Sequence, residues 1–372
     1  MKRIIIFGIT GSIGRQTYEI VTNQKNFELV GISFNSNFSF AKEISDKHKK
    51  IEIYSQKVTT LNTVKDYEEM IKKCEPDLIV NAITGFAGIE ITQLSIKYNI
   101  DLALANKESL VVAGKFIIDY SRKNPNWKLY PIDSEHSSLY YLISKIKHSI
   151  KNIYITASGG PFYLLNKQEL DNKKFIDAIK HPNWKMGEKI SIDSATLINK
   201  CFEIIEAHCL FNQYPVKSIY HPQSIVHAII ELIDGTFISN MSYPDMGIPI
   251  SLALNDFSVV NLNSDKKLNL SNLNLYFDEI DENKWLPIKW ANQFIQTNNF
   301  TIGLIIVLLD DYLIQMYKKN TITFNEITSI IDEYILKYSK NFINEWNDIY
   351  KIKLEIENDF CLQYREKLWK KN

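Results

Sequence analysis

The fold of the amino-terminal part is decided by one short stretch, Arg3-Ile-Ile-Ile-Phe-Gly8-Ile-Thr-Gly11-Ser-Ile-Gly14. Residues 3–7 form an apolar run typical of a buried strand, and three glycines follow it directly. A helical pattern over residues 15–22 and an apolar run over residues 27–33 complete a strand–turn–helix–strand unit. The glycine spacing differs by one residue from the usual dinucleotide-binding pattern, but its place between strand and helix predicts a pyrophosphate site. A tight turn without a ligand is the alternative.

The same alternation continues further along the chain. A strand is expected over residues 77–82, a glycine turn over 84–88, a helix ending near Tyr98 and another strand over 101–105. Repeated units of this kind build a doubly wound, mostly parallel sheet. We therefore expect an α/β fold class with a Rossmann-type nucleotide-binding domain over residues 1–150.

The pattern changes from Lys151 onward. Strand-like runs at residues 153–157, 218–232 and 236–241 surround a helix, which predicts a central α+β domain over residues 151–259. Residues 260–281 lack clear periodicity and are expected to form a linker. A C-terminal helical bundle over residues 282–372 is predicted from helical patterns at 285–296, 302–316, 324–338 and 342–364.

Composition excludes several classes of function. The 372 residues include 43 Lys and Arg against 43 Asp and Glu, so no overall field attracts nucleic acid or an anionic membrane. The four cysteines show no C-x-x-C spacing, and the chain opens on Met-Lys-Arg followed at once by a strand-like run, without a secretory signal. The longest apolar run, residues 302–309, is far below the ~20 residues of a membrane span. We expect a cytoplasmic enzyme that does not enter a membrane.

The segment His181 to Ala207 concentrates groups that bind anions, bind cations and stack on ligands. Asp193 or Ser194 is the expected N-cap of a helix, in which Asn199, Glu203 and Glu206 recur at i, i+4 and i+7. This spacing places an amide and two carboxylates on one stripe beside Lys200, which could face a charged substrate. The alternative is a surface helix in which Lys200 and Glu203 form an ordinary ion pair.

The end of the second strand bears on the choice of cofactor. Residues 33–37, Ser-Phe-Asn-Ser-Asn, contain no Asp or Glu where an NAD enzyme holds the ribose 2′-hydroxyl. The absence of a carboxylate favours NADPH. This loop has no basic residue of its own, and Lys42 is the nearest following cation that could reach a 2′-phosphate.

Two carboxylates after a strand-like run suggest a metal site. In an extended chain Asp133 and Glu135 project to the same side, which suits a hard cation such as Mg²⁺ or Mn²⁺. Glu203 could supply a third ligand. The alternative is an ordinary loop or helix start, and neither His136 nor His208 is taken as a ligand.

Two further turns carry anion-binding groups. Ser158-Gly-Gly-Pro161 offers a hydroxyl and backbone N–H groups, and with Ser194, Asn199 and Lys200 it could hold a phosphate. Residues 105–109, Ala-Asn-Lys-Glu-Ser, follow a sheet strand at the edge where α/β sheets bind ligands. The alternatives are a simple turn in the first case and a helix start with an exposed Lys107 in the second.

Together these segments resemble the 1-deoxy-D-xylulose 5-phosphate reductoisomerase family. The resemblance covers the first 250 residues in the family's order and rests on residues 8–14, 106–109, 133–136, 158–162, 181–207, 221–224 and 244–246. It implies NADPH- and divalent-metal-dependent rearrangement and reduction of 1-deoxy-D-xylulose 5-phosphate to 2-C-methyl-D-erythritol 4-phosphate, in the non-mevalonate isoprenoid pathway. It also implies a homodimer with one Mg²⁺, Mn²⁺ or Co²⁺ and a phosphorylated ketose substrate, the central domain being both catalytic and dimer-forming.

The resemblance also implies roles for individual residues. The metal ligands are Asp133, Glu135 and Glu203, and the catalytic group includes these with Lys107, His181 and Trp184. The substrate contacts are Lys107, Ser134, Glu135, Ser158, His181, Ser194, Asn199, Lys200 and Glu203. The cofactor contacts are Thr10, Gly11, Ser12, Ile13, Asn37, Asn106, Glu108 and Gly187. Residues 181–188, with His181, Trp184 and Met186, correspond to a flap that closes over the substrate.

The chain departs from the family pattern at three places. Cys201 replaces a small glycine, Gly247 stands where Arg or Lys is common, and residues 305–311 replace an Asn-Ala-Ala-Asn-Glu-like stretch. The rival interpretations are a metal-free NADP-dependent dehydrogenase similar to homoserine dehydrogenase and a catalytically silent nucleotide-binding protein.

Overall fold

The computed structural model describes residues 1–182, 184, 186–262, 268–365 and 367. The chain forms two compact units, each built from several segments. The first comprises residues 1–109, 117–141 and 245–265, and the second comprises residues 110–116, 142–244 and 266–372. The expected division at residues 150, 259 and 281 remains a prediction, and parts of its linker and last segment lie outside the described residues.

The first unit contains the predicted doubly wound sheet. Its six strands are all parallel and lie in the order β3-β2-β1-β4-β5-β6. The strands are β1 (Lys2–Phe7), β2 (Phe27–Phe34), β3 (Glu52–Ser55), β4 (Leu78–Asn81), β5 (Asp101–Leu104) and β6 (Leu129–Pro131). Because β2 and β4 flank β1 on opposite sides, the chain reverses its winding direction there, and the carboxyl ends of these strands border a ligand crevice in folds of this type.

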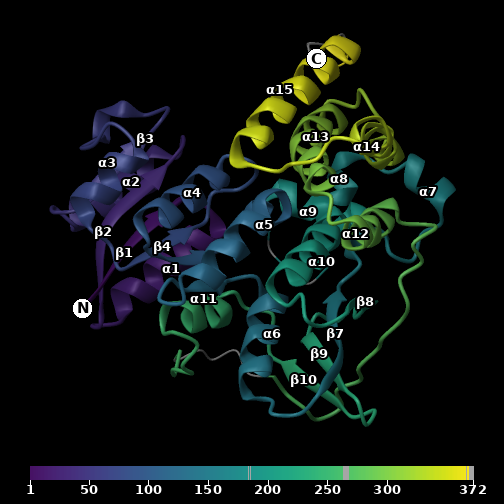
Figure 1. The fold of residues 1–372 in the computed structure, drawn as a ribbon, viewed down its shortest axis with the longest axis horizontal. Coiled ribbons are helices and arrows are strands. Elements are labelled where there is room, and N and C mark those ends of the chain that lie inside the picture. Colours follow the sequence, from purple (N-terminus) through teal and green to yellow (C-terminus); the bar gives the residue numbers. More distant parts are fainter. Residues whose placement is uncertain (183, 185, 263–267, 366, 368–372) are drawn as a thin grey trace. The chain divides into compact units, whose positions relative to one another are not determined.

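Helices cover both faces of this sheet. Ile4 and Ile6 of β1 belong to one buried cluster with side chains of α1 (Ser12–Asn23), α2 (Phe38–Lys47) and α11 (Gly247–Leu254). On the other face, a Cβ at Gly31 of β2 would contact Ile5 of β1 together with Met70 and Cys74 of α3 (Tyr67–Cys74). Burial on both faces explains why β1 is a continuous apolar run. Figure 1 shows α11 beside α1 although the two are far apart in sequence.

The remaining helices of the first unit follow the strands in alternation. They are η1 (Thr59–Leu61), α4 (Gly88–Tyr98), α5 (Glu108–Lys123) and α6 (Ser134–Lys145), and parts of α5 and α6 are assigned to the second unit.

The second unit contains a mixed four-stranded sheet in the order β10-β9-β7-β8. β7 (Ile150–Ala157) pairs in parallel with β8 (Val216–Tyr220) and antiparallel with β9 (Val226–Leu232), and β10 (Phe237–Met241) lies at the edge. The prediction of one continuous strand-like run over residues 218–232 is wrong. Residues 221–225 turn the chain, with Ser224 in the left-handed region at φ 54°, so the run is two strands on opposite sides of β7.

The helix expected within residues 181–207 also differs from expectation. It is two helices, α9 (Glu188–Thr196) and α10 (Ile198–Leu210), separated by Leu197 at φ 62°. Asp193 and Ser194 therefore lie inside α9 and cap nothing. The side chain of Leu197 is buried, so tertiary packing holds a leucine in a conformation that local preference disfavours.

The C-terminal helices are α12 (Leu286–Thr297), α13 (Phe300–Lys318), α14 (Phe324–Tyr338) and α15 (Trp346–Gln363), and three short elements, η2 (Gly160–Phe162), α7 (Lys167–Asp171) and α8 (Phe175–Ala178), precede α9. α13 packs against both α14 and α15, as Figure 1 shows. By length and composition α13 could span a membrane. The sequence analysis considered only the apolar run 302–309 and therefore underestimated the length of this apolar helix. However, 83% of its most apolar window is buried inside the protein, as expected of a core helix.

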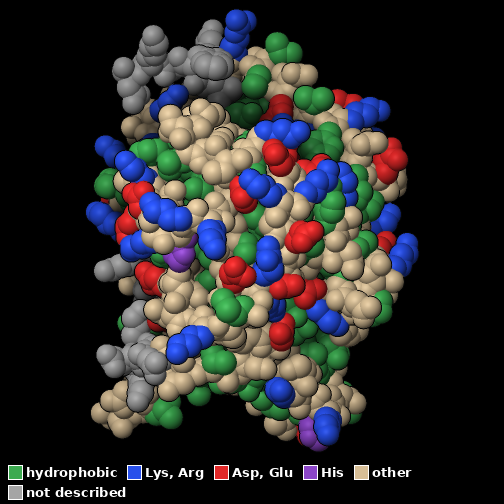
Figure 2. Space-filling view, turned by 90° about the vertical axis from the view of Figure 1, so that its left-hand side faces the viewer, with side chains coloured by type: hydrophobic (Ala, Val, Ile, Leu, Met, Phe, Trp, Pro, Cys, Tyr) green, Lys and Arg blue, Asp and Glu red, His purple; other side chains and the backbone are tan. Residues whose placement is uncertain are grey.

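Charged side chains are mixed on the face shown in Figure 2. Lys and Arg are interspersed with Asp and Glu over the described part of this face, without an extended area of one sign. This distribution agrees with the balanced charge of the sequence.

A close approach of α13 to the backbone of α5 gives a stability prediction. A Cβ at Gly303 would lie 2.2 Å from the carbonyl oxygen of Val111, which no side-chain rotation can relieve. Overpacking costs ~1–3 kcal/mol and exceeds the helix-propensity gain of alanine, at most ~1 kcal/mol. We expect Gly303→Ala to lower the urea midpoint of unfolding. Gly247→Ala is the control, because its Cβ would be 3.4 Å from Asp245, and equal stability of the two variants would contradict the packing argument.

Candidate active site

The glycine turn after β1 is shaped by close backbone contacts. Gly8 has φ 86°, and a Cβ there would lie 2.6 Å from the carbonyl oxygen of Ala82. A Cβ at Gly14 would lie 2.3 Å from the carbonyl oxygen of Gly8, so this glycine lets α1 pack against the turn. Gly11 and Ser12 are exposed at the amino end of α1. The turn therefore presents accessible backbone where the sequence predicted a pyrophosphate.

The loop after β2 contains hydroxyl and amide groups. Ser55 Oγ donates a hydrogen bond to the Asn35 carbonyl (2.8 Å), and Ser39 Oγ donates to Asn37 Oδ1 (3.1 Å). The ammonium of Lys42 lies 5.9 Å from the ring centre of Phe38 on α2. This arrangement is compatible with the predicted preference for NADPH, because no acidic side chain occupies the loop.

Asn106 and Glu108 organise the turn that follows β4. The Asn106 amide donates to the carbonyls of Ile83 (2.8 Å) and Gly85 (2.9 Å), while the N–H of Gly85 donates to Glu108 (2.9 Å). Both side chains are buried. They shape the backbone of a turn at the carboxyl edge of the sheet, a contribution that the sequence did not specify.

Lys107 and Asp133 form an ion pair between the start of α5 and the end of β6. Each side chain is only 15% exposed, so the alternative of an exposed Lys107 is wrong. Ser134 donates its N–H to Asp133 (2.9 Å) and its hydroxyl to Glu135 (2.7 Å). α6 begins at Ser134, so Asp133 and Glu135 do not share one side of an extended chain. The helix start brings the serine between them instead.

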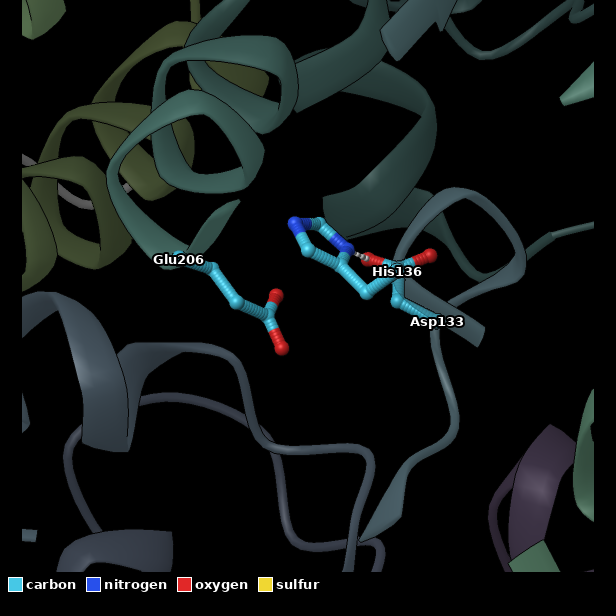
Figure 3. Close-up of side chains that lie close together, drawn as sticks. All are labelled: Asp133, His136 and Glu206. Atoms are coloured by element: carbon cyan, nitrogen blue, oxygen red, sulfur yellow. Dashed lines mark ion pairs between the residues drawn. The ribbon is translucent and has the colours of Figure 1, made fainter. Parts of the chain in front are cut away.

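His136 is fully buried one residue further along α6. Its Nδ1 lies 4.0 Å from Asp133 Oδ2, and Figure 3 shows the imidazole directed at this carboxylate. Glu206, also drawn in Figure 3, is a buried residue of α10 in the second unit. The contact between His136 and Asp133 was not anticipated from the sequence, although their i, i+3 spacing at a helix start is a signal for it.

In the second unit, the Ser158 turn lies against α9. Gly159 and Gly160 have φ values of 79° and 61°, and a Cβ at Gly160 would be 2.8 Å from the carbonyl oxygen of Ser194. Only glycine allows this approach. Two of the residues predicted to bind phosphate, Ser158 and Ser194, therefore lie on adjoining segments.

Lys200 and Glu203 form a buried ion pair on α10. Lys200 is 4% exposed and Glu203 1% exposed, which rules out the surface-helix alternative. The Lys200 ammonium also donates to the carbonyl of Thr156 at the end of β7, and Asn199 donates to the second oxygen of Glu203 (2.5 Å). Breaking such a buried pair on one side costs ~3–5 kcal/mol, because a charge is left without a partner.

His181 connects the predicted flap with the Ser158 turn. Its Nδ1 accepts the backbone N–H of Trp184 (3.0 Å), and its Nε2 lies 2.9 Å from Ser158 Oγ. Because Nδ1 accepts, the neutral ring carries its proton on Nε2 and donates it to Ser158. Burial lowers the pKa of His181 to about 4, so the ring is neutral near pH 7.

Trp184 is partly buried, and its ring packs edge-on against His227 at 6.3 Å between ring centres. Met186 is also partly buried, and Gly187 is exposed at the N-cap of α9. Asn183 and Lys185 of the predicted flap lie outside the described residues.

Sequence reasoning missed a charge cluster that fixes α9. Lys189 pairs with Asp193, Asp310 and Asp311, and Asp310 is fully buried. Burial raises the pKa of Asp193 and of Asp310, and Lys189 opposes that rise. The sequence signal for this cluster was the pair Asp310 and Asp311, two acids directly after the apolar run of α13. The divergent 305–311 segment thus anchors the helix that carries Ser194.

The departures from the family pattern do not disturb these contacts. Cys201 is fully buried on α10, where burial raises the pKa of its thiol and keeps it protonated. Gly247 is the first residue of α11, and its N–H donates to Asp245 (3.0 Å).

Comparison with family models covers most of the chain. Residues 4–114 match 1-deoxy-D-xylulose 5-phosphate reductoisomerase, residues 129–211 match the C-terminal domain of that family, and residues 241–358 match the DXP reductoisomerase C-terminal domain. A reductoisomerase from Malacoplasma penetrans is 48% identical over 86% of this chain and 84% of its own length. Another, from Caldanaerobacter subterraneus, is 42% identical over 68% of this chain and 71% of its own.

Solved structures agree along nearly the whole chain. A crystal structure of DOX-P reductoisomerase in complex with NADPH, fosmidomycin and magnesium is 28% identical, with a TM-score of 0.87, and covers 99% of this chain and 98% of that one. The Zymomonas mobilis enzyme in complex with NADPH is 25% identical, with a TM-score of 0.84, covering 97% and 98%. By sequence identity and by fold, the chain belongs to the 1-deoxy-D-xylulose 5-phosphate reductoisomerase family.

Proposed function

We propose that this chain converts 1-deoxy-D-xylulose 5-phosphate to 2-C-methyl-D-erythritol 4-phosphate with NADPH and a divalent metal. The observation that carries the proposal is the match along nearly the whole chain to a reductoisomerase solved with NADPH, fosmidomycin and magnesium. A simple dehydrogenase or a silent nucleotide-binding protein is not favoured, since both the sequence relatives and the matching solved structures are reductoisomerases.

The donor set fits a hard divalent cation. We assign Asp133, Glu135 and Glu203 as its ligands, because carboxylate oxygens are what Mg²⁺ prefers. In the structure Lys107 pairs with Asp133 and Lys200 with Glu203, so these two carboxylates already have positive partners. A bound cation supplies Lewis-acid stabilisation of negative charge on the substrate oxygens. Mg²⁺ is the metal named for the family structures, and Mn²⁺ and Co²⁺ remain alternatives.

The groups that now contact these carboxylates can contact the substrate instead once a cation neutralises the carboxylates. Lys107 and Asn199 then become available to hydrogen-bond the oxygens of the substrate, and we assign Ser134 to the same task. Their present partners, Asp133, Glu135 and Glu203, are the proposed ligands. This exchange of partners would couple substrate binding to metal binding.

We assign Ser158, Ser194, Asn199 and Lys200 to the phosphate of the substrate. His181 donates to Ser158 Oγ, which leaves the serine hydroxyl proton free to reach a phosphate oxygen. The phosphate is remote from the reacting carbons, so its binding energy is used for orientation. Lys200 supplies the positive charge near the end of β7.

We assign Trp184 and Met186 to a flap, residues 181–188, that excludes water from the reaction. Support comes from the contacts of His181, which link this segment to the Ser158 turn. Gly187 lies at the N-cap of α9 near the end of this segment, and a Cβ there would meet nothing within 4 Å.

NADPH binding is assigned to the glycine turn and its neighbours. Bound NADPH supplies the hydride for the reduction step. Thr10, Gly11, Ser12 and Ile13 offer backbone to the pyrophosphate, Asn37 lies in the loop after β2, and Gly187 precedes α9. Asn106 and Glu108 contribute by shaping the turn after β4.

We further propose a cytoplasmic homodimer that binds neither nucleic acid nor membrane. The balanced charge of 43 against 43 supports the absence of a nucleic-acid partner. We retain the division into a nucleotide-binding domain (1–150), a catalytic and dimerisation domain (151–259), a linker (260–281) and a C-terminal helical domain (282–372).

The proposed reaction is tested by NADPH oxidation with 1-deoxy-D-xylulose 5-phosphate, measured with and without added Mg²⁺. We expect oxidation that requires both substrate and metal, and a product that is the branched polyol phosphate. Metal-independent oxidation, or activity on an unphosphorylated substrate instead, would point to a dehydrogenase.

Glu203→Gln tests the ligand assignment. The amide is a poor metal ligand, so we expect kcat/KM to fall by at least a factor of ~100, with NADPH affinity nearly unchanged. Because this change also leaves Lys200 without its counter-charge, circular dichroism must show that the variant is folded, and Asp133→Asn provides a second test. Glu355→Gln, on an exposed position of α15, is the control. Near-normal activity of folded Glu203→Gln at low Mg²⁺ would remove this residue from the ligand set.

Trp184→Phe tests the flap. The chain has six tryptophans, so the ligand-induced change in intrinsic fluorescence must be compared between variants. We expect fosmidomycin with Mg²⁺ to alter the fluorescence of the parent protein, and the change to be largely lost in Trp184→Phe because the ring moves over the ligand. Trp346→Phe, at the start of α15, should retain it. A change that persists undiminished in Trp184→Phe would contradict the assignment.

A further inference from the structure

The 2′-phosphate of NADPH is an anion, and the loop after β2 provides no cation to pair with it. In doubly wound folds the adenosine ribose lies beside the end of the second strand, and a nearby arginine accommodates a 2′-phosphate. Residues 35–37 are Asn-Ser-Asn, without a charge of either sign. A cation that pairs with the 2′-phosphate must therefore come from outside this loop.

Arg15 is anchored to the glycine turn on one side. It lies in the first turn of α1, where its backbone N–H donates to the carbonyl of Gly11 (3.0 Å). Its side chain folds back toward the turn, and Nε donates to the carbonyl of Thr10 (3.1 Å). The guanidinium is thus held beside the predicted pyrophosphate site.

On its other side, Arg15 packs against the helix that follows the Asn-Ser-Asn loop. The guanidinium carbon lies 3.9 Å from the ring centre of Phe40, in the first turn of α2. Phe40 in turn packs edge-on against Tyr18 of α1, with 5.9 Å between ring centres. The guanidinium therefore lies between the two segments that border the expected position of the ribose, and the cation–π contact with Phe40 helps to hold it there.

The terminal nitrogens of Arg15 remain available. Among the described residues, no carboxylate forms an ion pair with Arg15, and only Nε is used in a hydrogen bond. An arginine held in place with its paired N–H donors open matches the geometry of a phosphate. Preorganisation of this kind lowers the cost of binding.

The rival cation is less well placed. Lys42, the residue suggested by the sequence, is exposed, and its ammonium lies 5.9 Å from the ring centre of Phe38 without a fixed hydrogen bond among the described residues. A flexible lysine must lose side-chain entropy to reach a phosphate.

We propose that Arg15 is the residue that selects NADPH over NADH, by binding the ribose 2′-phosphate through its terminal guanidinium nitrogens. The inference rests on the proposed function only in taking NADPH as the cofactor. All residues involved belong to the first unit. Helix α1 then binds both phosphate groups of the adenosine half of NADPH. Its amino end binds the pyrophosphate, and its Arg15 binds the 2′-phosphate.

The test is a fluorescence titration of the full-length protein with NADPH and with NADH, comparing the parent with Arg15→Gln. We expect the parent to bind NADPH more tightly. In the variant the Kd for NADPH should rise by about 10- to 150-fold, the range for losing a charge-assisted hydrogen bond, while the Kd for NADH stays nearly unchanged. Arg15→Lys should recover part of the difference. The measurement needs no turnover, so it separates this assignment from the chemistry.

Two controls identify the source of the effect. Arg122→Gln removes the same charge from the last turn of α5, at the opposite edge of the sheet, and should leave both affinities unchanged. Lys42→Gln should also retain the preference for NADPH. An equal loss of both nucleotides in Arg15→Gln would mean that Arg15 only supports the turn, and loss of the preference in Lys42→Gln would transfer the role to Lys42; either result overturns the proposal. Failure of the parent to bind NADPH would contradict the proposed function itself.

Discussion

The buried ammonium of Lys200 is the constraint on which the site in the second unit depends. A charge with so little exposure must be paired and hydrogen-bonded, or the protein loses several kcal/mol. Lys200 meets this requirement with the carbonyl of Thr156 and the carboxylate of Glu203. The first contact ties α10 to the end of β7, and the second fixes the orientation of Glu203. Asn199, the residue before Lys200, donates a hydrogen bond to the other oxygen of the Glu203 carboxylate.

The same pairing of lysine and carboxylate recurs in the first unit, where Lys107 meets Asp133. In both units a lysine ammonium lies beside a carboxylate that we propose as a metal ligand. The pairs also keep the lysines close to the acids they would leave on metal binding. In the proposed function these lysines bind a phosphorylated substrate, and the ion pairs keep them stable in its absence.

Charged side chains hold the local structure at two places where the sequence pattern alone did not predict them. Residues 305–311 have diverged, yet Asp310 provides a buried carboxylate that holds Lys189 and, through it, α9. The loop after β2 has no cation, and Arg15 of α1 packs against Phe40 of the helix that follows this loop.

The sequence by itself determined the architecture and the chemical inventory. Glycines at 8 and 14 have almost no alternative, since any side chain would collide with backbone, so the strand–turn–helix unit could be predicted from local pattern alone. Only the tertiary structure decided how the inventory is arranged. Leu197 takes a left-handed conformation because its side chain is buried, which splits one expected helix into two and moves Asp193 and Ser194 away from a cap. Lys200 is buried and Lys107 is partly buried, each beside a carboxylate instead of lying exposed. Long-range packing removes water from both lysines, and local spacing contains no measure of that desolvation.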